Sequence, residues 1–267
     1  MNLIELQGVR KYYRQGGLLG AKNKVEVLNG VDLVVRPGQC LGLLGASGCG
    51  KSTAGRLALG LEKPDAGGVF YKGRDLKELS GEEWKNFRRN SQVVFQNSHG
   101  AVNPRHRAWR IVTESLSNFS AMNHNDLRDQ AVGLLQRVGL SAADLDKLPH
   151  QFSGGELQRV CVARALALKP EFILLDEAVS SLDMLSQSRV LDLLAELKAE
   201  TGAAFLFISH DLRVLLKISD SLVIMDQGRI TSHVEDMAEL ERAGAVYDPA
   251  FVKLAGAVLP AEPVHHA

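Results

Sequence analysis

The sequence predicts an α/β fold with a mostly parallel sheet core, an N-terminal antiparallel β region and an inserted helical subdomain. Four short apolar runs support this prediction, because runs without polar alternation are typical of strands buried on both faces of a parallel sheet. They are Leu41–Leu44, Val93–Phe95, Phe172–Leu175 and Ala203–Ile208. A buried helix could produce one such run but hardly four, each ending abruptly at polar residues.

The spacing of apolar residues divides the chain into three parts. Residues 1–95 and 160–235 carry the strand-like runs and are assigned to the core, and the first 35 residues predict short strands around a glycine-rich excursion at 16–20. Residues 96–159 show helical spacing and no strand signal, which predicts the inserted subdomain. This spacing is carried by Leu127, Ala131, Leu134, Leu135 and Val138. Residues 236–267 are expected to form a helix-like C-terminal tail.

Composition excludes several classes of protein. Lys plus Arg and Asp plus Glu number 31 each in 267 residues, and this balance argues against a nucleic-acid partner. The three cysteines show neither a CxxC pattern nor metal-ligand spacing, which indicates reduced thiols. No signal peptide is visible, and no apolar run approaches the roughly 18–20 residues of a spanning helix. A membrane role therefore requires a protein partner.

A glycine-rich segment follows the first apolar run. It matches the phosphate-binding pattern G-x-x-x-x-G-K-[ST] with Gly45, Ala46, Ser47, Gly48, Cys49, Gly50, Lys51, Ser52 and Thr53. The glycines let backbone N–H groups surround phosphates, and the following helix presents its positive N-terminus to them. Lys51 can then reach the β- and γ-phosphates, and the Ser52 hydroxyl can ligate Mg²⁺. The alternative, a glycine-rich turn without a ligand, does not require this lysine, so we expect a P-loop (RecA-like) core that binds nucleotide.

Polar residues also follow the other three runs. Because ligands bind beyond the carboxyl ends of strands in open α/β sheets, these residues are expected to share one site. Asp176 is placed to hold Mg²⁺, and Glu177 to orient or deprotonate an attacking water. A DE pair that merely starts a surface turn is the alternative. Gln96 and His210 are weak signals alone, since a lone histidine is as often a surface or core residue, but their place at strand ends favours a γ-phosphate contact for His210.

Two further motifs have competing interpretations. Ser153, Gly154, Gly155 and Glu156 form an S-x-x-E capping box, and the same helix N-terminus is also an anion site. Because the P-loop already serves one nucleotide, this second site suggests a phosphate contact across a dimer. Near the N-terminus, Tyr12 and Tyr13 can stack on an adenine face or pack on the core as strand aromatics.

Taken together, these residues resemble the ABC-transporter ATPase family over essentially the whole chain. The P-loop, the Q-loop at Gln96, the signature Ser153–Arg159, the DE pair, the D-loop Ser181–Asp183 and the switch histidine His210 occur in the family's order. The resemblance implies an ATPase whose cofactors are ATP and Mg²⁺. It also favours Tyr13 as the adenine-stacking aromatic and makes Gln96 a link between Mg²⁺ and the helical subdomain.

The resemblance also implies how two subunits cooperate. Two cassettes close head-to-tail on two ATP molecules, so that Ser153, Gly154, Gly155 and Glu156 contact the partner's nucleotide. Glu177 acts as catalytic base, His210 contacts the γ-phosphate, and Asp183 acts across the dimer. Two departures from the usual pattern stand out: the signature has Phe152 and Glu156 where LSGGQ is usual, and Ala178-Val179 replaces Pro-Thr. Glu156 brings a carboxylate near the partner's nucleotide, although it also improves the helix cap.

Within the family, the chain resembles the importers of dipeptides, oligopeptides and nickel. The similar stretches are 16–20, Ala101–Arg105 and 254–260. This resemblance implies the motor of a nickel importer at the cytoplasmic face of the inner membrane. Its expected partners are a second ATPase subunit in a heterodimer, two transmembrane permeases and an extracytoplasmic solute-binding protein. A dipeptide or oligopeptide importer and a soluble ATP-switched ABC scaffold are the alternatives.

Overall fold

The structure, a computed structural model, describes residues 1–15 and 23–237. Its largest sheet has six strands in the order β10-β9-β3-β8-β7-β6, and every neighbouring pair is parallel except β9 and β10. The strands are β3 (Cys40–Gly45), β6 (Ser91–Phe95), β7 (Phe172–Asp176), β8 (Ala204–Ser209), β9 (Ser221–Asp226) and β10 (Arg229–Val234). All four apolar runs therefore form strands of one mostly parallel sheet, as predicted.

The second sheet is antiparallel throughout, with the strand order β2-β1-β4-β5. It consists of β1 (Ile4–Gln15), β2 (Asn23–Val35), β4 (Ala66–Tyr71) and β5 (Arg74–Asp75). The prediction of short strands in the first 35 residues is wrong, because β1 and β2 have 12 and 13 residues. Shifts of register between them mark bulges, which let a long pair continue while it twists. The glycine-rich stretch 16–20 lies outside the described residues.

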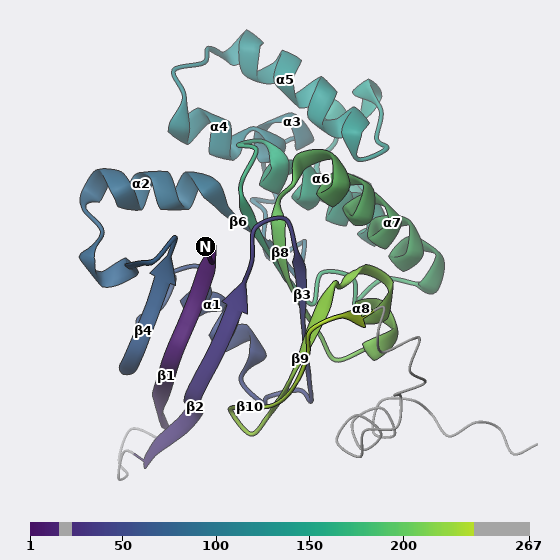
Figure 1. Ribbon diagram of the computed structural model, residues 1–267. Coiled ribbons are helices and arrows are strands. Elements are labelled where there is room, and N and C mark those ends of the chain that lie inside the picture. The colour runs from purple at the N-terminus through teal and green to yellow at the C-terminus, as the bar shows by residue number, and fades with distance from the viewer. Residues whose placement is uncertain (16–22, 238–267) are drawn as a thin grey trace, which may run out of the picture.

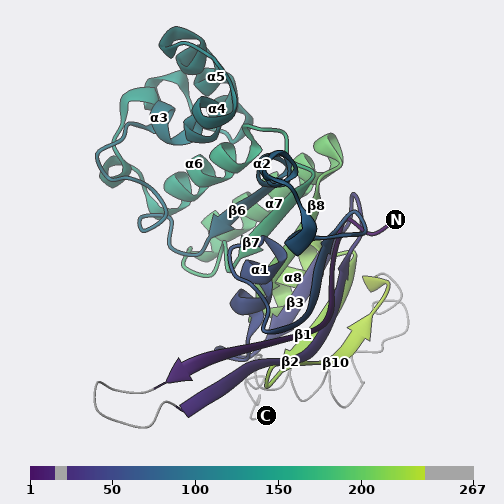
Figure 2. The same ribbon diagram turned by 90° about the vertical axis from the view of Figure 1, so that its left-hand side faces the viewer.

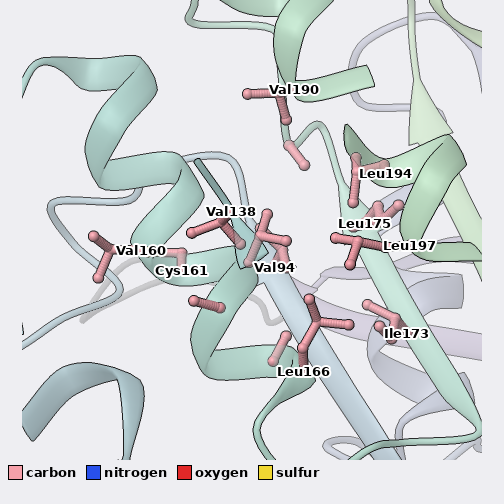
Figure 3. Packing of buried hydrophobic residues seen from close by; sticks show 14 of the residues in the cluster. Val94, Val138, Val160, Cys161, Leu166, Ile173, Leu175, Val190, Leu194 and Leu197 are labelled. Atoms are coloured by element: carbon pink, nitrogen blue, oxygen red, sulfur yellow. The ribbon is translucent and has the colours of Figure 1, made fainter. Parts of the chain in front are cut away.

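Strands β3, β7 and β8 at the centre of the six-stranded sheet are buried on both faces, and their residues alternate between two cores. Ile173 and Leu175 of β7 belong to one hydrophobic cluster, whereas Phe172 and Leu174 belong to the other. Figure 3 shows the first cluster, in which residues of β7 pack with those of helices α6 (Gly154–Leu166) and α7 (Met184–Thr201). Two buried faces explain why the strand sequences are apolar at consecutive positions.

The helices cover the sheets and build a separate layer. Helix α1 (Lys51–Ala58) lies in the core between the two sheets, whereas α2 (Gly81–Asn90) packs near β6 and α8 (Leu212–Ile218) packs near β3 and β8. Helices α3 (Ala108–Val112), α4 (Glu114–Phe119) and α5 (His124–Arg137) gather with part of α6 at one end of the molecule (Figures 1 and 2).

Short 3₁₀ turns join these elements: η1 (Leu76–Glu78), η2 (Ala142–Asp146) and η3 (Pro149–Gln151). The limit assigned to the helical subdomain at residue 159 falls within α6, which continues into the core cluster. Residues 238–267, which include most of the assigned C-terminal tail and the 254–260 stretch, lie outside the described residues. Within the part that is described, no helix is long and apolar enough to cross a membrane.

Candidate active site

The glycine-rich loop joins the fully buried strand β3 to helix α1. Gly48 and Gly50 have φ angles of 80° and 114°, which side-chain-bearing residues rarely adopt. Gly45 has no room for a side chain, because a Cβ there would lie 2.4 Å from the carbonyl oxygen of Met225. These glycines shape a loop that ends at a helix N-terminus, the arrangement that binds phosphates through backbone N–H groups.

Lys51 begins helix α1 and is only 4% exposed. Its Nζ donates hydrogen bonds to the carbonyl oxygens of Gly45 and Ala46, at 2.7 and 2.9 Å. Two bonds from one ammonium hold it across the inside of the loop. The Lys51 ammonium therefore lies inside the loop, at the position from which the motif predicts that it contacts a phosphate.

The end of β7 brings a buried carboxylate beside the start of α1. Ser52 Oγ donates to Asp176 Oδ1 at 3.0 Å, and Asp176 is 9% exposed. Burial raises the pKa of Asp176, and the Glu177 carboxylate raises it further, while the Ser52 hydrogen bond and two nearby cations oppose this. A hydroxyl and an incompletely compensated buried carboxylate are hard oxygen donors of the kind that Mg²⁺ prefers, so these residues fit that ion.

Glu177 adopts an unusual backbone conformation. Its φ of 48° costs on the order of 1–3 kcal/mol for a residue with a side chain. Neighbouring hydrogen bonds hold it there: its N–H donates to the Ile208 carbonyl at 3.0 Å, and Ser180 Oγ donates to its carbonyl at 3.0 Å. His210, just beyond β8, places Nδ1 3.3 Å from Glu177 Oε2. The two adjacent strand ends thus bring the carboxylate and the imidazole together.

Gln96 is joined to Glu177 through Ser180. Its Nε2 donates to Ser180 Oγ at 3.1 Å, which leaves Oε1 as the atom that could face a cation. One cavity of about 280 Å³ brings residues of the P-loop together with Gln96 and Glu177. It is lined by Val27, Ser47, Gly48, Gly50, Lys51, Ser52, Thr53, Gln96 and Glu177.

The signature residues lie elsewhere, at the start of α6. Ser153 Oγ accepts from the N–H of Glu156 at 3.3 Å, and Glu156 Oε2 accepts from the N–H of Ser153 at 2.8 Å, so the capping box is formed. Gly155 packs against α7, where a Cβ would lie 3.0 Å from that of Ser186. Asp183 caps α7 by accepting from the N–H groups of Leu185 and Ser186.

Tyr13 is 36% exposed and lies on β1 rather than among the cavity-lining residues, with its hydroxyl bonded to Glu62. Tyr12 is close to Lys24, whose Nζ lies 4.0 Å from its ring centroid. Both tyrosines are thus strand aromatics, and the adenine contact assigned to Tyr13 stays a prediction.

The structure adds three residues to the site that the sequence analysis did not assign to it. Val27 lines the cavity, and its carbonyl oxygen would lie 2.9 Å from a Cβ on Gly50. Ser180 bridges Gln96 and Glu177, as described above. Gln158 is 1% exposed and donates from Nε2 to the carbonyl of Phe95 at 3.3 Å, which joins α6 to the residue before Gln96. Only Gln158 carried a signal, since it lies within the signature segment.

Comparison with known proteins agrees with this geometry. Residues 28–180 match the family model described as ABC transporter. The chain is also 44% identical over 261 residues to the nickel import ATP-binding protein NikE of Rhodospirillum rubrum, with 98% of this chain and 93% of that protein covered. The protein of the same name from Escherichia coli is 42% identical over 264 residues, with 99% and 97% covered. The chain belongs to the ABC transporter family. It is the ATP-binding subunit of such a transporter and hydrolyses ATP to drive transport.

Solved structures show the same architecture. The dimeric cassette MJ0796 in a post-hydrolysis state with ADP and Pi has a TM-score of 0.77 and 27% identity, over 88% of this chain and 99% of that one. The cassette cbiO1 of Clostridium perfringens, part of the complex cbiONQ, has a TM-score of 0.75 over 96% of this chain and 99% of that one. At 21% identity the second comparison concerns the fold alone. These similarities confirm the predicted fold class, and the chain is expected to act within a complex that contains permease subunits.

Proposed function

We propose that the protein is the ATP-hydrolysing subunit of a nickel importer and that it closes as a dimer on two MgATP. The observation that carries the hydrolytic part is the meeting of Glu177 and His210 beside the P-loop, Ser52 and Asp176. The cargo rests on similarity, because relatives named for nickel import match nearly the full chain.

The residues in and around the cavity divide the reaction among them. Backbone N–H groups of Gly45–Thr53 and the Lys51 ammonium bind the β- and γ-phosphates. A water oxygen attacks the γ-phosphorus while the bond to the β–γ bridging oxygen breaks, and Glu177 accepts the proton of that water. His210 is within reach of the same phosphate and of Glu177. Ser52, Asp176 and Gln96 would hold Mg²⁺, which when bound neutralises charge on the phosphates.

A second cassette completes the site in this proposal. The N-terminus of α6, with Ser153, Gly154 and Gly155, offers N–H groups that can contact the partner's phosphates. Glu156 is turned back onto its own cap, so its carboxylate is occupied within α6 rather than aimed outward. We infer a heterodimer at the cytoplasmic face of the inner membrane, together with two permeases and an extracytoplasmic solute-binding protein.

The helical subdomain offers a surface for a membrane subunit. A groove of about 410 Å³ is lined by Arg105, Arg107, Trp109, Arg110, His124, Arg128 and Asp146. Among these lining residues Asp146 is the only carboxylate, and Arg107 and Arg128 both contact it. The groove therefore carries net positive charge and suits an acidic segment of a permease.

The proposal is tested by uptake of radiolabelled nickel and of a labelled dipeptide. Cells should carry the wild type, Glu177→Gln, or Glu171→Gln, which changes a glutamate at the opposite end of β7. The proposal is supported if Glu177→Gln abolishes nickel uptake but not dipeptide uptake, while Glu171→Gln leaves both unchanged. Loss of dipeptide uptake instead would transfer the cargo to peptides, and no loss of either would favour an ATP-switched scaffold.

The same assay tests the arginine groove. Arg110→Glu should reduce uptake while ATP hydrolysis by the purified subunit stays within about twofold of wild type, because the change is remote from the cavity. Lys85→Glu, a charge reversal on exposed α2, is the matched control. Equal uptake by both variants would remove the groove from the docking surface.

A further inference from the structure

Glu62 lies just beyond helix α1 and accepts hydrogen bonds from side chains of two separate elements, β1 and α1. One carboxylate oxygen accepts a hydrogen bond from the hydroxyl of Tyr13 on β1. The other accepts from Arg56 Nε on α1, at 2.6 Å. Its side chain is 23% exposed, so water competes only partly for these bonds. A single carboxylate thus joins a strand of the antiparallel sheet to the helix that follows the P-loop.

The connection continues to the phosphate end of α1. Arg56 Nη2 donates to Thr53 Oγ1 at 3.2 Å, and Thr53 is a buried member of the phosphate-binding motif that lines the cavity. Tyr13, Glu62, Arg56 and Thr53 therefore form one continuous chain of hydrogen bonds. It runs from the exposed aromatic ring to the cavity.

Other contacts keep Glu62 charged and in place. Burial raises the pKa of Glu62, but hydrogen bonds from Tyr13 and Arg56 and the charges of Arg56 and Lys11 lower it below its ordinary value. Lys11 Nζ lies 3.7 Å from the Glu62 carboxylate and also donates to the carbonyl of Lys63 at 2.7 Å. The segment after α1 is thereby fastened to β1, and the acceptor for the tyrosine hydroxyl is a fixed carboxylate.

We propose that Glu62 is a positioning residue for the nucleotide base: it fixes the ring of Tyr13 through the hydroxyl and anchors it, through Arg56, to Thr53 of the P-loop. The proposal rests on the proposed function, since it takes Tyr13 as the base-stacking aromatic. A ring with two free torsions offers a better stacking surface when its far end is held, because less conformational entropy is lost on binding. Glu62 would then raise affinity for adenine nucleotides without touching the phosphates.

The test compares binding of adenylyl imidodiphosphate with binding of inorganic tripolyphosphate, which lacks the base, by isothermal titration calorimetry. The variants are Tyr13→Phe, Glu62→Gln, their double mutant and Tyr13→Ala. Each of the first two should weaken nucleotide binding about three- to tenfold, the size of the net contribution of one typical hydrogen bond. The double mutant should be no weaker than Glu62→Gln alone, because Tyr13→Phe and Glu62→Gln both act on the same Tyr13–Glu62 contact. Tripolyphosphate binding should stay within about twofold of wild type.

A matched pair elsewhere in the chain provides the control. Tyr71 donates its hydroxyl to Glu171 at 3.0 Å, so Glu171→Gln disrupts a tyrosine–glutamate bond that is not at the cavity. This control should change the affinity for neither adenylyl imidodiphosphate nor tripolyphosphate.

An equal loss of affinity for both ligands with Glu62→Gln, or effects that multiply in the double mutant, would overturn the positioning role. If Tyr13→Ala weakens nucleotide binding but Glu62→Gln does not, only this inference fails. If Tyr13→Ala has no effect on nucleotide binding, Tyr13 does not contact the base and this inference fails. Absence of nucleotide binding by the wild type would refute the proposed function itself.

Discussion

At the scale of single residues, the site depends on side chains held by backbone atoms of neighbouring elements. Lys51 is bound by two carbonyls of its own loop, Glu177 is held at a positive φ by contacts with β8 and Ser180, and Asp176 is paired with Ser52. Each functional group is therefore placed before ligand arrives, which lowers the reorganisation that binding and reaction require.

Replacing Lys51 tests this placement. Lys51→Ala should weaken ATP binding by at least tenfold, about 1.4 kcal/mol, because it removes the ammonium from the phosphate loop. Calorimetry with Lys85→Ala, an exposed lysine on α2, provides the comparison. An unchanged affinity for ATP would take Lys51 out of the phosphate site.

The sequence could predict these residues to the extent that a motif or a strand end marked them. The P-loop has a fixed spacing, and Gln96, Asp176, Glu177 and His210 each follow an apolar run. Val27 and Ser180 had no such mark. Their roles depend on a bulge between β1 and β2 and on the turn after Glu177, and both are set by the tertiary path of the backbone rather than by local spacing.

At the scale of elements, helix α6 shows how an unusual signature residue is accommodated. Glu156 completes a reciprocal cap with Ser153, and the two hydrogen bonds from Ser153 lower the pKa of Glu156. Phe152, which replaces the usual leucine, is 6% exposed and packs in the larger core cluster. Both departures therefore stabilise the start of the helix.

The cap predicts a pH-dependent effect on stability. Glu156→Ala should cost about 1 kcal/mol and lower Tm by about 2–4 °C, whereas Glu156→Gln should be close to wild type because glutamine also forms the box. The charged part of the stabilisation is complete above the ordinary pKa of 4.5 and is lost as the pH falls through the lowered folded value. Thermal unfolding at pH 7 and at acidic pH measures this. A Glu156→Ala variant as stable as wild type at pH 7 would show that the cap contributes nothing.

The element pattern was predictable where periodicity was unambiguous. The four apolar runs became β3, β6, β7 and β8, and the helical spacing at 127–138 became α5. The lengths of β1 and β2 were not predictable, since bulges interrupt the alternation by which a long strand is recognised.

At the scale of the whole molecule, two hydrophobic cores enclose the sheet and keep its cysteines from solvent. Burial raises the pKa of Cys40 to about 12 and that of Cys161 to about 11. Both lie in the larger cluster, among strands and helices from the two halves of the chain. The rate at which a reagent modifies these two thiols therefore measures how often the whole fold opens.

Alkylation with iodoacetamide at pH 8 should label Cys40 and Cys161 only through unfolding. Adenylyl imidodiphosphate at a hundred times its Kd should stabilise the fold by about 2.7 kcal/mol and slow this labelling about a hundredfold. Mass spectrometry of each cysteine peptide, with and without the ligand, gives the rates. Labelling of Cys161 that the ligand does not slow would mean that the helical layer opens locally.

The central claim is that the P-loop, Asp176, Glu177 and His210 form one ATP-hydrolysing site. The measurement that tests it most directly is ATP binding and ATP turnover in the same preparation of Glu177→Gln, with Glu171→Gln as control. The account predicts ATP affinity near that of wild type and turnover lower by a hundredfold or more, about 2.7 kcal/mol of barrier. Turnover within a few-fold of wild type would contradict the assignment of Glu177 as the catalytic base.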